Sequence, residues 1–595
     1  MVNLDSAYRC FDYLCGGILL LTVAFCYMLM QICWLLDIYS VHFALPVAFV
    51  AAVLCMCYPV EKRQIKLSVL AVFMAFVILL ALMFLTALWT DSSFDGICYH
   101  QEQVALIYGG WNPSIRQLEP QVSNVWVNHY PIGMESVGAA IMGVTGHLQS
   151  AKAIIPIMAI MTYVLSRGLL AQVIPGVKPN IRTWIAVLIA CNPVIVAQLL
   201  SSYVDGTIAE YIAMTILLAI AIVVRGRNDW HNYLLLAAII VLSVATKFSS
   251  LVLELVTAAL LFLGFWIFGY LKQCGRFFII SVLFGTVGVF LFSYYPYVVN
   301  WQTAGNPLYP LAGDGAIDII SAATADTFGE GSSRFANFFR SIYAWRIKSG
   351  VAPAVGGFSI TFAVLFPISV AIIIIDAVRC KKFTPELYSM ICMVASCFIF
   401  EACWWARYIP YLWLLVPLSF YTINRDGIVF KLRKLLSVTI SILSLLGASS
   451  VLIYTAFITF RYTSHRNAVY AVLRGKTVPM TGAYVQLQRL MEEHEINVVP
   501  LSFYDKPSQV LRRGISGVAS KYTLDCYGEP IFYDWPFMYV WLTPEQKAEF
   551  ESELTTTAFY RLYHAVRPDQ TVIRDYHEPI PALRHIESLR IPTPD

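Results

Sequence analysis

The chain has 595 residues, of which 58% are hydrophobic and 13% charged, with a formal net charge of +4 and a mean hydropathy of +0.66. A globular protein of this length and composition could not stay in solution, so the composition excludes a soluble fold and indicates a protein embedded in membrane lipids. The small net charge is spread over many loops and forms no basic stripe with interleaved aromatic residues, which argues against nucleic acid as a partner.

Long apolar runs recur from near the N-terminus to about residue 459. A hydrocarbon core about 30 Å thick takes roughly 20 apolar residues per helix. We therefore expect an all-α polytopic domain over residues 1–459, with about thirteen transmembrane helices and the first of them retained as an anchor. The expected spans are 15–36, 41–60, 67–90, 151–172, 183–200, 204–225, 231–246, 249–270, 277–297, 356–378, 387–404, 407–424 and 435–459.

Basic residues sort the short loops between these spans into two sets. Every strongly basic loop falls on one side of the membrane, and the positive-inside rule makes that side the cytoplasm, together with the N-terminus. The loops at 91–150 and 298–355 then face outward. The basic residues are Lys62, Arg63, Lys66, Arg225, Arg227, Lys272, Arg276, Arg379, Lys381, Lys382, Arg425, Lys431, Arg433 and Lys434.

The chain changes character near residue 460, where charged and apolar residues become mixed. We expect residues 460–595 to form a soluble α/β or α+β domain on the non-cytoplasmic side, large enough to hold a core of its own. The stretch 132–148 is too short and too rich in glycine to span a bilayer, so we expect a helix that lies at the outer interface.

Acidic residues gather where the third expected span ends. Asp91 and Asp95 follow this span, and Tyr99, His100 and Glu102 come directly after them. A carboxylate at a dry membrane surface can act as a general base toward a hydroxyl group, or it can hold a divalent cation. An ordinary acidic loop, in which Asp95 caps a helix over 96–109, explains the same residues. The residues alone leave both interpretations open.

Two further groups of polar residues lie in the outer loops. His129 precedes a Tyr-Pro turn in the first loop, where the residues favour a structural role over a functional one. In the second loop, the stretch 300–310 contains Asn306 and Tyr309 within Asn-Pro and Tyr-Pro pairs. These pairs favour a rigid loop, and we expect the whole stretch to be non-helical.

Lys247 and Arg407 are isolated cations at outer junctions between expected spans. An unpaired charge at such a place is costly, so each predicts an anionic partner. For Lys247 the candidates are the carboxylate of Asp205 or a lipid phosphate, unless the side chain only extends to the headgroups. The planar guanidinium of Arg407 suits bidentate phosphate binding.

Four of these stretches resemble bacterial type-C glycosyltransferases, the multi-pass family that includes protein O-mannosyltransferases and lipid A aminoarabinose transferases. The stretch 94–100 (FDGICYH) resembles the family's Asp-x-x-x-Tyr-His motif, and 245–248 (ATKF) is similar to its Gly-Thr-Lys-Tyr. The stretch 300–310 resembles its Asn-x-x-x-x-Gly-Asn-Pro-x-Tyr-Pro loop, and 407–410 resembles its late Arg-Tyr-x-x-Pro. The likeness covers residues 90–425, and the order and expected sidedness agree.

The resemblance implies that a sugar passes from a polyprenyl-phosphate carrier to a glycan, lipid or protein acceptor at the outer face of a bacterial inner membrane, with inversion. Asp95 would be the catalytic base. Lys247 and Arg407 would bind the lipid phosphate and stabilise its charge as it departs. The residues expected to bind substrate are Asp91, Tyr99, His100, Glu102, His129, Asp205, Asn306 and Tyr309.

The chain departs from the family at one position, because mannosyltransferases place Glu directly after the first Asp and this chain has Gly96. Glu102 would lie one to two turns further along the same helix, and Asp91 is another candidate for the base. No His or Cys set has the spacing of a zinc site, so we expect no cofactor and no metal. A divalent cation held by Asp91 and Asp95 is the alternative.

Two other functions fit the composition. A transporter or flippase of lipid-linked sugars would carry ionisable residues near mid-membrane, and Glu210 and Glu254 are the residues here that fit this requirement. An envelope polysaccharide polymerase or ligase would use an Arg-rich outer loop, for which Arg334, Arg340 and Arg346 are candidates.

Overall fold

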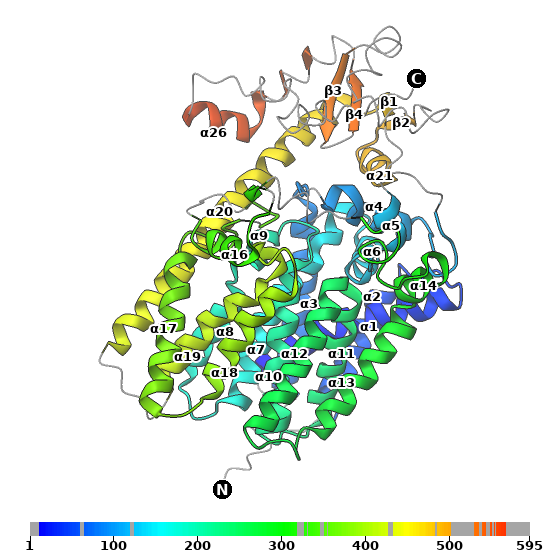
Figure 1. The fold of residues 1–595 in the computed structure, drawn as a ribbon. Helices are drawn as coiled ribbons and strands as arrows, with labels where there is room; N and C mark the ends of the chain where they lie inside the picture. Colours follow the sequence, from blue (N-terminus) through cyan, green and yellow to red (C-terminus); the bar gives the residue numbers. More distant parts are fainter. Residues whose placement is uncertain are drawn as a thin grey trace.

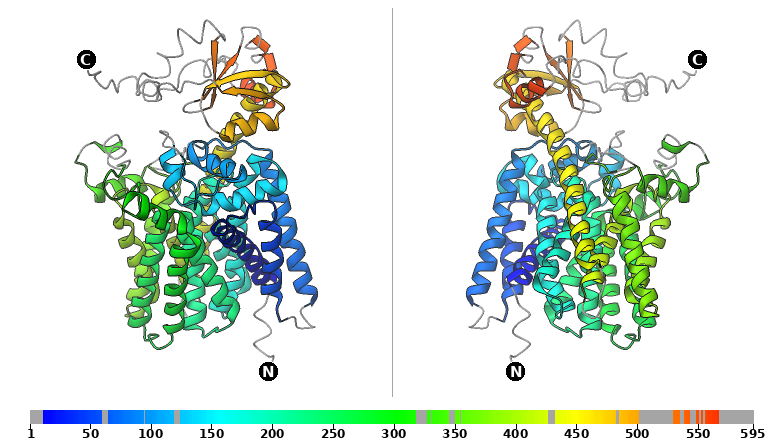
Figure 2. Two further views of the ribbon diagram at one scale, coloured as in Figure 1. Left: turned by 90° about the vertical axis from the view of Figure 1, so that its right-hand side faces the viewer. Right: turned by 90° about the vertical axis from the view of Figure 1, so that its left-hand side faces the viewer.

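The computed structural model is a helical bundle that carries a small β-sheet at one end (Figures 1 and 2). We call the end with the sheet the outer end and the opposite end the inner end. The structure describes residues 11–59, 65–93, 95–118, 124–317, 327–329, 331–344, 350–353, 355–425, 432–481, 485–500, 529–534, 538–542, 548–549, 552–553 and 555–566.

Within these ranges, eight helices are long and apolar enough to cross a membrane. Each of the thirteen expected spans overlaps a helix, but several of those helices are short, so the count of thirteen stays a prediction. The eight long helical segments are Phe11–Leu35, Ile65–Ala87, Leu148–Val173, Asp205–Val224, Phe248–Ile267, Gly275–Phe292, Phe362–Cys380 and Arg433–Leu473.

The helices of the N-terminal half are α1 (Phe11–Leu35), α2 (Ala44–Cys57), α3 (Ile65–Ala87), α4 (Gln101–Tyr108), α5 (Asn124–His129), α6 (Gly133–Thr145), α7 (Ile154–Val173), α8 (Pro179–Ala190), α9 (Pro193–Gln198), α10 (Asp205–Ala219), α11 (Trp230–Thr246), α12 (Phe248–Ile267), α13 (Gly275–Val287) and α14 (Val299–Ala304). The later helices are α16 (Arg334–Ile342), α17 (Phe362–Cys380), α18 (Pro385–Ser396), α19 (Leu415–Asn424), α20 (Arg433–Leu473), α21 (Val485–Glu493) and α26 (Ala558–Val566).

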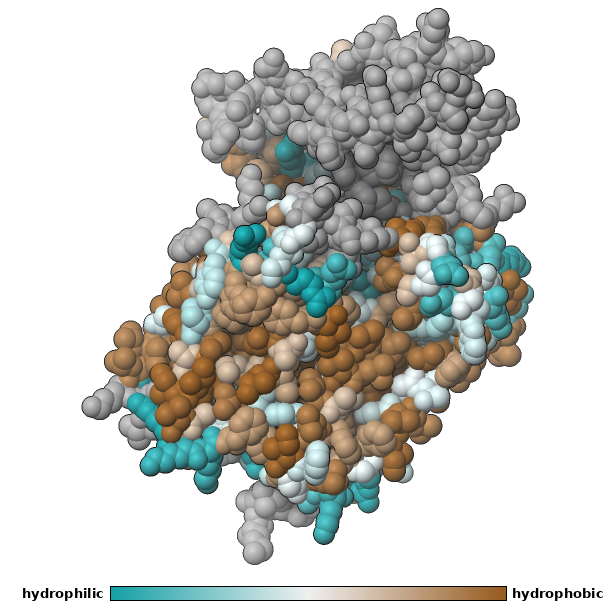
Figure 3. Space-filling view, in the orientation of Figure 1, coloured by the Kyte–Doolittle hydropathy of each residue, from teal (hydrophilic) through white to brown (hydrophobic). Residues whose placement is uncertain are grey.

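Burial separates a central group of helices from a peripheral one. In the most apolar window of the segment Asp205–Val224, 83% of the residues are buried, against 11% in Gly275–Phe292. The outward faces of the peripheral helices are apolar, with Phe73, Phe278 and Ile453 among their exposed residues. Figure 3 shows one such face as an area in which brown residues predominate, with paler residues among them. Such an area fits lipid and would be unfavourable in water.

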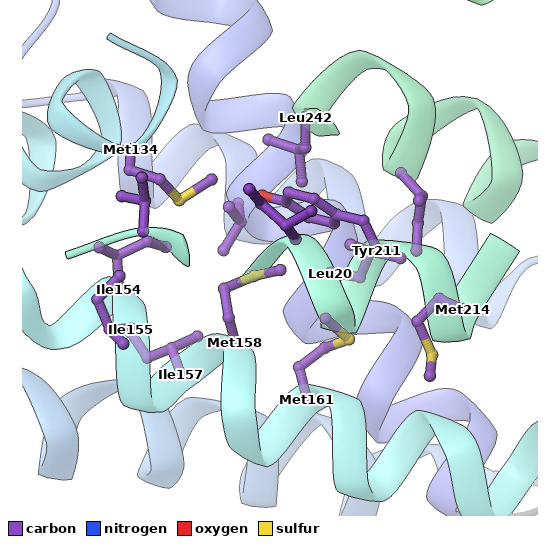
Figure 4. Packing of buried hydrophobic residues seen from close by; sticks show 14 of the residues in the cluster. Leu20, Met134, Ile154, Ile155, Ile157, Met158, Met161, Tyr211, Met214 and Leu242 are labelled. Carbon is purple, nitrogen blue, oxygen red and sulfur yellow. The ribbon is translucent and has the colours of Figure 1, made fainter. Parts of the chain in front are cut away.

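The centre of the bundle contains several methionines packed around Tyr211 of α10. Figure 4 shows Met158, Met161 and Met214 beside this ring and Leu20 of α1. The Tyr211 hydroxyl lies 3.1 Å from Oγ1 of Thr246 on α11, so the ring's polar end is hydrogen-bonded within the core. Flexible thioether side chains fill the irregular space between helices of different tilt.

Two of the loops in which the sequence has basic residues lie at the inner end. The hairpins between α12 and α13 and between α17 and α18 lie at this end (Figure 1), and Figure 3 shows hydrophilic residues there. Arg425 donates to Asp376 of α17 at 2.6 Å and pairs with Glu386 of α18, which ties three helices together. The assignment of this end to the cytoplasm stays a prediction.

The outer end carries the short helices α4, α5, α6, α14 and α16 (Figure 1). The stretch 132–148 contains α6, which is buried along most of its length and packs on α1, α2 and α11. The expectation that 300–310 is entirely non-helical was wrong, because α14 covers Val299–Ala304. The prolines of this stretch come after that helix, which Gly305 ends in a left-handed conformation with φ of 70°.

The last bundle helix, α20, has 41 residues and continues beyond residue 459 to Leu473. A four-stranded sheet follows it, in the order β2-β1-β4-β3. The strands are β1 (Thr477–Thr481), β2 (Asn497–Pro500), β3 (Glu529–Asp534) and β4 (Met538–Leu542). β1 pairs with β2 in parallel and with β4 antiparallel, β3 pairs with β4 antiparallel, and α21 connects β1 to β2.

Candidate active site at the outer end

Asp95 and Arg407 form an ion pair although they lie in distant parts of the chain. Nη1 of Arg407 donates to Oδ2 of Asp95 at 3.2 Å, and both side chains are largely buried. Asp95 begins the helical turn Gly96–His100 that precedes α4, and its side chain does not cap that turn. The structure therefore does not show the helix cap that Asp95 could have formed.

Lys247 and Asp205 form a second ion pair, which confirms the carboxylate as the partner of Lys247. Nζ of Lys247 lies 2.5 Å from Oδ1 of Asp205, and the two side chains are 7% and 1% exposed. Lys247 lies between α11 and α12, and Asp205 begins α10. The second oxygen of Asp205 accepts a hydrogen bond from Nε2 of Gln198 at 3.1 Å.

The two pairs act on each other, and we call Asp95, Arg407, Asp205 and Lys247 the outer charge cluster. Burial alone would lower the pKa of Arg407, but Asp95 and then Asp205 hold it well above its ordinary value. Burial likewise lowers the pKa of Lys247, and Asp205 more than offsets this, so the net pKa is raised. Both cations therefore stay charged at any physiological pH.

Aromatic rings surround the guanidinium of Arg407. Its Cζ lies 4.7 Å from the ring centroid of Trp405 and 5.5 Å from the centroids of Tyr203 and Tyr408. Nζ of Lys247 lies 5.3 Å from the centroid of Tyr408, so this ring faces both cations. The sequence pointed to neither Tyr203 nor Trp405 as a site residue, because aromatic residues are common throughout the chain.

Asp91 lies beside the cluster but has a structural environment. It is fully buried, and its two oxygens accept hydrogen bonds from the backbone N–H groups of Ser93 and Ser202, each at 2.8 Å. A Cβ on Gly96 would lie 2.3 Å from Oδ2 of Asp91. The carboxylate of Asp91 therefore occupies the space that a side chain at position 96 would need.

Tyr99 and His100 are buried behind the cluster. Nδ1 of His100 is paired with Oε1 of Glu135 on α6. The His100 ring packs on Tyr99, with 4.2 Å between centroids, and meets the edge of Tyr203 at 6.5 Å. These residues support the ring that faces Arg407.

His129 belongs to a second polar group that joins the two outer loops. Its Nδ1 lies 2.8 Å from Oδ1 of Asn300, and the Asn300 amide donates to the carbonyls of His129 and Tyr309, both at 2.9 Å. Burial lowers the pKa of His129 more than this bond to Asn300 raises it. Asn306 accepts from the N–H of Leu308 at 2.8 Å and so stabilises its own loop.

Glu102 faces away from the cluster and toward α21. Its carboxylate accepts the backbone N–H groups of Val485 and Gln486 at 3.0 and 2.9 Å. Both oxygens are used in this way, so we leave Glu102 out of the proposed substrate site.

Within the described ranges, no three or more His, Cys, Asp and Glu side chains are grouped so that they could hold a metal ion. The absence of a cofactor stays a prediction. Of the candidate polymerase arginines, Arg334 and Arg340 lie on α16, while Arg346 falls outside the described residues.

Comparisons with known proteins add one structural likeness. No protein-family model matches the chain, and no curated protein matches it. The chain resembles the crystal structure of ArnT from Cupriavidus metallidurans bound to undecaprenyl phosphate, with a TM-score of 0.45 and 12% sequence identity. The match covers 79% of this chain and 97% of that one. At this level of likeness, the function has to be argued from this chain's own residues.

Proposed function

We propose that this protein is a membrane glycosyltransferase that moves a sugar from a polyprenyl-phosphate carrier to a glycan, lipid or protein acceptor. The proposed place of transfer is the outer face of a bacterial inner membrane. The observation that carries the proposal is the outer charge cluster, in which two carboxylates and two permanent cations lie together at the end of an apolar bundle. The resemblance of the four sequence stretches supports the same function, since three of them contribute Asp95, Lys247 and Arg407.

The ion pair between Asp95 and Arg407 suggests how the donor would bind. A lipid phosphate that enters the cluster competes with Asp95 for the guanidinium, and Lys247 attracts it further. Arg407 then turns from the carboxylate to the phosphate, and Asp95 is released to accept a proton. Binding of the donor would in this way prepare the base.

The chemical step is a displacement at the anomeric carbon. The oxygen of the acceptor hydroxyl attacks the anomeric carbon from the face opposite the phosphate. Asp95 takes the proton of this hydroxyl during the attack. A new glycosidic bond forms, the bond to the phosphate oxygen breaks, and the configuration inverts. The electron pair of the broken bond stays on the lipid phosphate, where Lys247 and Arg407 stabilise the added negative charge.

The variant Asp95→Asn tests the proposal. Purified protein is incubated with radiolabelled polyprenyl-phosphate sugars and a membrane extract that supplies acceptors, and transfer of label is measured. We expect transfer by the wild type and a loss of at least about a hundredfold in the variant, because the amide cannot take the proton.

Asp314→Asn is the matched control, since Asp314 is exposed in the second outer loop and lies outside the cluster. It should transfer label at the wild-type rate. Undiminished transfer by Asp95→Asn would exclude Asp95 as the base, and an absence of transfer from every donor by the wild type would contradict the enzyme function.

A transporter of lipid-linked sugars is the second candidate, and Glu210 is the observation that favours it. This carboxylate lies on α10, is 1% exposed, and has no hydrogen-bond partner among the described residues. An ionisable side chain in such a position is often part of a transport path. The test is movement of a labelled lipid-linked sugar between the two leaflets of a proteoliposome membrane. Movement that is abolished in Glu210→Gln and retained in Asp95→Asn would favour the transporter.

A further inference from the structure

The helix α21, outside the bundle, contacts the turn that carries Asp95. The side-chain amide of Gln486 donates to the carbonyl oxygen of Ile97, which lies in the turn Gly96–His100. The backbone N–H of the same residue donates to Glu102 on α4 at 2.9 Å. Gln486 and Glu102 are both buried, so water does not compete for these bonds. One residue of α21 thus holds both the turn and the helix that follows it.

Two more contacts fix α21 along its length. At its C-terminal end, Oε1 of Glu493 accepts the backbone N–H of Leu148 at 2.7 Å. In its middle, the guanidinium of Arg489 lies 5.5 Å from the ring centroid of Tyr108, at the end of α4. At its N-terminal end, the carboxyl group of Glu102 accepts N–H groups that a helix start leaves free. The three contacts define one orientation of α21 on the bundle.

The turn Gly96–His100 needs support from outside itself. It is π-helical, with the N–H of Gln101 bonded to the carbonyl of Gly96, a geometry that is rare and weaker than an α-helix. The turn follows Asp95 directly, so a shift of the turn changes the 3.2 Å separation between Asp95 and Arg407.

We propose that Gln486 and Glu102 are positioning residues that hold the turn Gly96–His100 and thereby place the Asp95 carboxylate for proton transfer. The inference rests on the proposed function, in which Asp95 is the base. It gives the C-terminal part of the chain a specific role, namely to keep the carboxylate of Asp95 at a fixed position relative to the cations that bind the donor. Neither residue touches the substrate in this proposal.

The variant Gln486→Met tests the inference, because methionine keeps the length of the side chain but cannot donate to Ile97. Positional errors of about 1 Å can cost about a hundredfold in rate, so we expect kcat to fall by about ten- to a hundredfold. The KM for the donor should stay within about twofold, since Lys247 and Arg407 are untouched. Hydrogen exchange of residues 96–108 should become faster, which a merely structural role elsewhere in the C-terminal part would not produce.

Glu495→Gln is the control, because Glu495 lies just beyond α21, is 70% exposed and pairs with Arg474, which is not one of the contacts between α21 and the bundle. It should change neither kcat nor the exchange of residues 96–108. If Gln486→Met does not elute as a folded protein, Glu102→Met replaces it with the same expectations, because methionine cannot accept the N–H groups of Val485 and Gln486.

Unchanged kcat and unchanged exchange in a folded variant would overturn the inference, as would a rise in KM with unchanged kcat. An absence of transfer by the wild type would overturn the proposed function instead. The exchange measurement alone then decides whether α21 holds the turn.

Discussion

The outer charge cluster consists of groups that are expensive to bury singly. Asp205 and Lys247 lose most of their hydration, and their mutual attraction offsets that cost only while both are present. Replacing a buried pair by apolar residues of similar volume is often neutral for stability, whereas removing one partner is strongly destabilising. Stability and function can therefore be separated at this pair.

We predict that Asp205→Leu lowers the free energy of unfolding by about 3–5 kcal/mol, because it leaves the ammonium of Lys247 buried without its partner. The double variant Asp205→Leu/Lys247→Met should regain most of this stability. Transfer of label should be lost in both. Thermal unfolding in detergent measures the stability, and the transfer assay measures the activity. Sugar transfer by the double variant would show that Lys247 does not bind the lipid phosphate.

Part of this site could be predicted residue by residue. Lys247 required a counter-ion because it lies between two apolar helices, and Asp205 was an evident candidate. The pairing of Asp95 with Arg407 could not be predicted, since 312 positions separate them and no local pattern reports such a contact. The contact of Glu102 with the start of α21 could not be predicted for a related reason, because a carboxylate in an acidic loop gives no sign of which helix start it faces.

At the scale of the elements, hydropathy located the helices but not their interruptions. The expected span 183–200 is divided into α8 and α9 around Asn192, whose side chain accepts the N–H of Val194 as a helix cap before Pro193. An Asn-Pro pair within an apolar run was the available signal. The long apolar stretch on each side of it concealed the break.

The contact between α1 and α7 depends on two glycines that face the opposite backbone. A Cβ on Gly168 would lie 2.7 Å from Cα of Tyr13, and a Cβ on Gly16 would lie 2.7 Å from the backbone N of Leu165. Small residues allow membrane helices to approach in this way. Hydropathy could not reveal it, since glycine is common in transmembrane helices.

We predict that Gly168→Ala destabilises the protein by about 1–3 kcal/mol, because the added methyl group meets backbone atoms that cannot move independently. Gly275→Ala is the control, since a Cβ there meets nothing within 4 Å. Unfolding of the two variants in the same detergent checks the prediction. Equal unfolding midpoints would show that α1 and α7 accommodate the methyl group without a loss of stability.

At the scale of the whole molecule, composition indicated a separate C-terminal region but not its attachment to the bundle. Glu102 makes this attachment sensitive to pH. Burial raises its pKa to about 7, against an ordinary value of 4.5, and the two backbone hydrogen bonds lower it by less. Glu102 therefore binds a proton more tightly when α21 is docked on α4 than when α21 has separated from it. Docking of α21 is for this reason strongest at low pH.

We predict that docking weakens as the pH rises from about 4.5 through about 7, by roughly 3 kcal/mol at most. Hydrogen exchange of residues 485–493, corrected for intrinsic rates, should report this weakening in the wild type. Glu102→Gln carries no titrating group and should give a flat profile. A wild-type profile that is equally flat would show that Glu102 does not control docking.

The length of α20 allows the bilayer to influence the turn beside Asp95. A helix of 41 residues is about 60 Å long, roughly twice the thickness of the hydrocarbon core. Oγ1 of its Thr463 accepts the N–H of Thr90, beyond the outer end of α3, and about 15 Å of helix rises past that point to the sheet. If the inner end of α20 stays in place, a tilt of about 10° therefore displaces its outer end by about 10 Å. Lipids of a different thickness, which change helix tilt, would pull on α21 and through Gln486 on the turn beside Asp95.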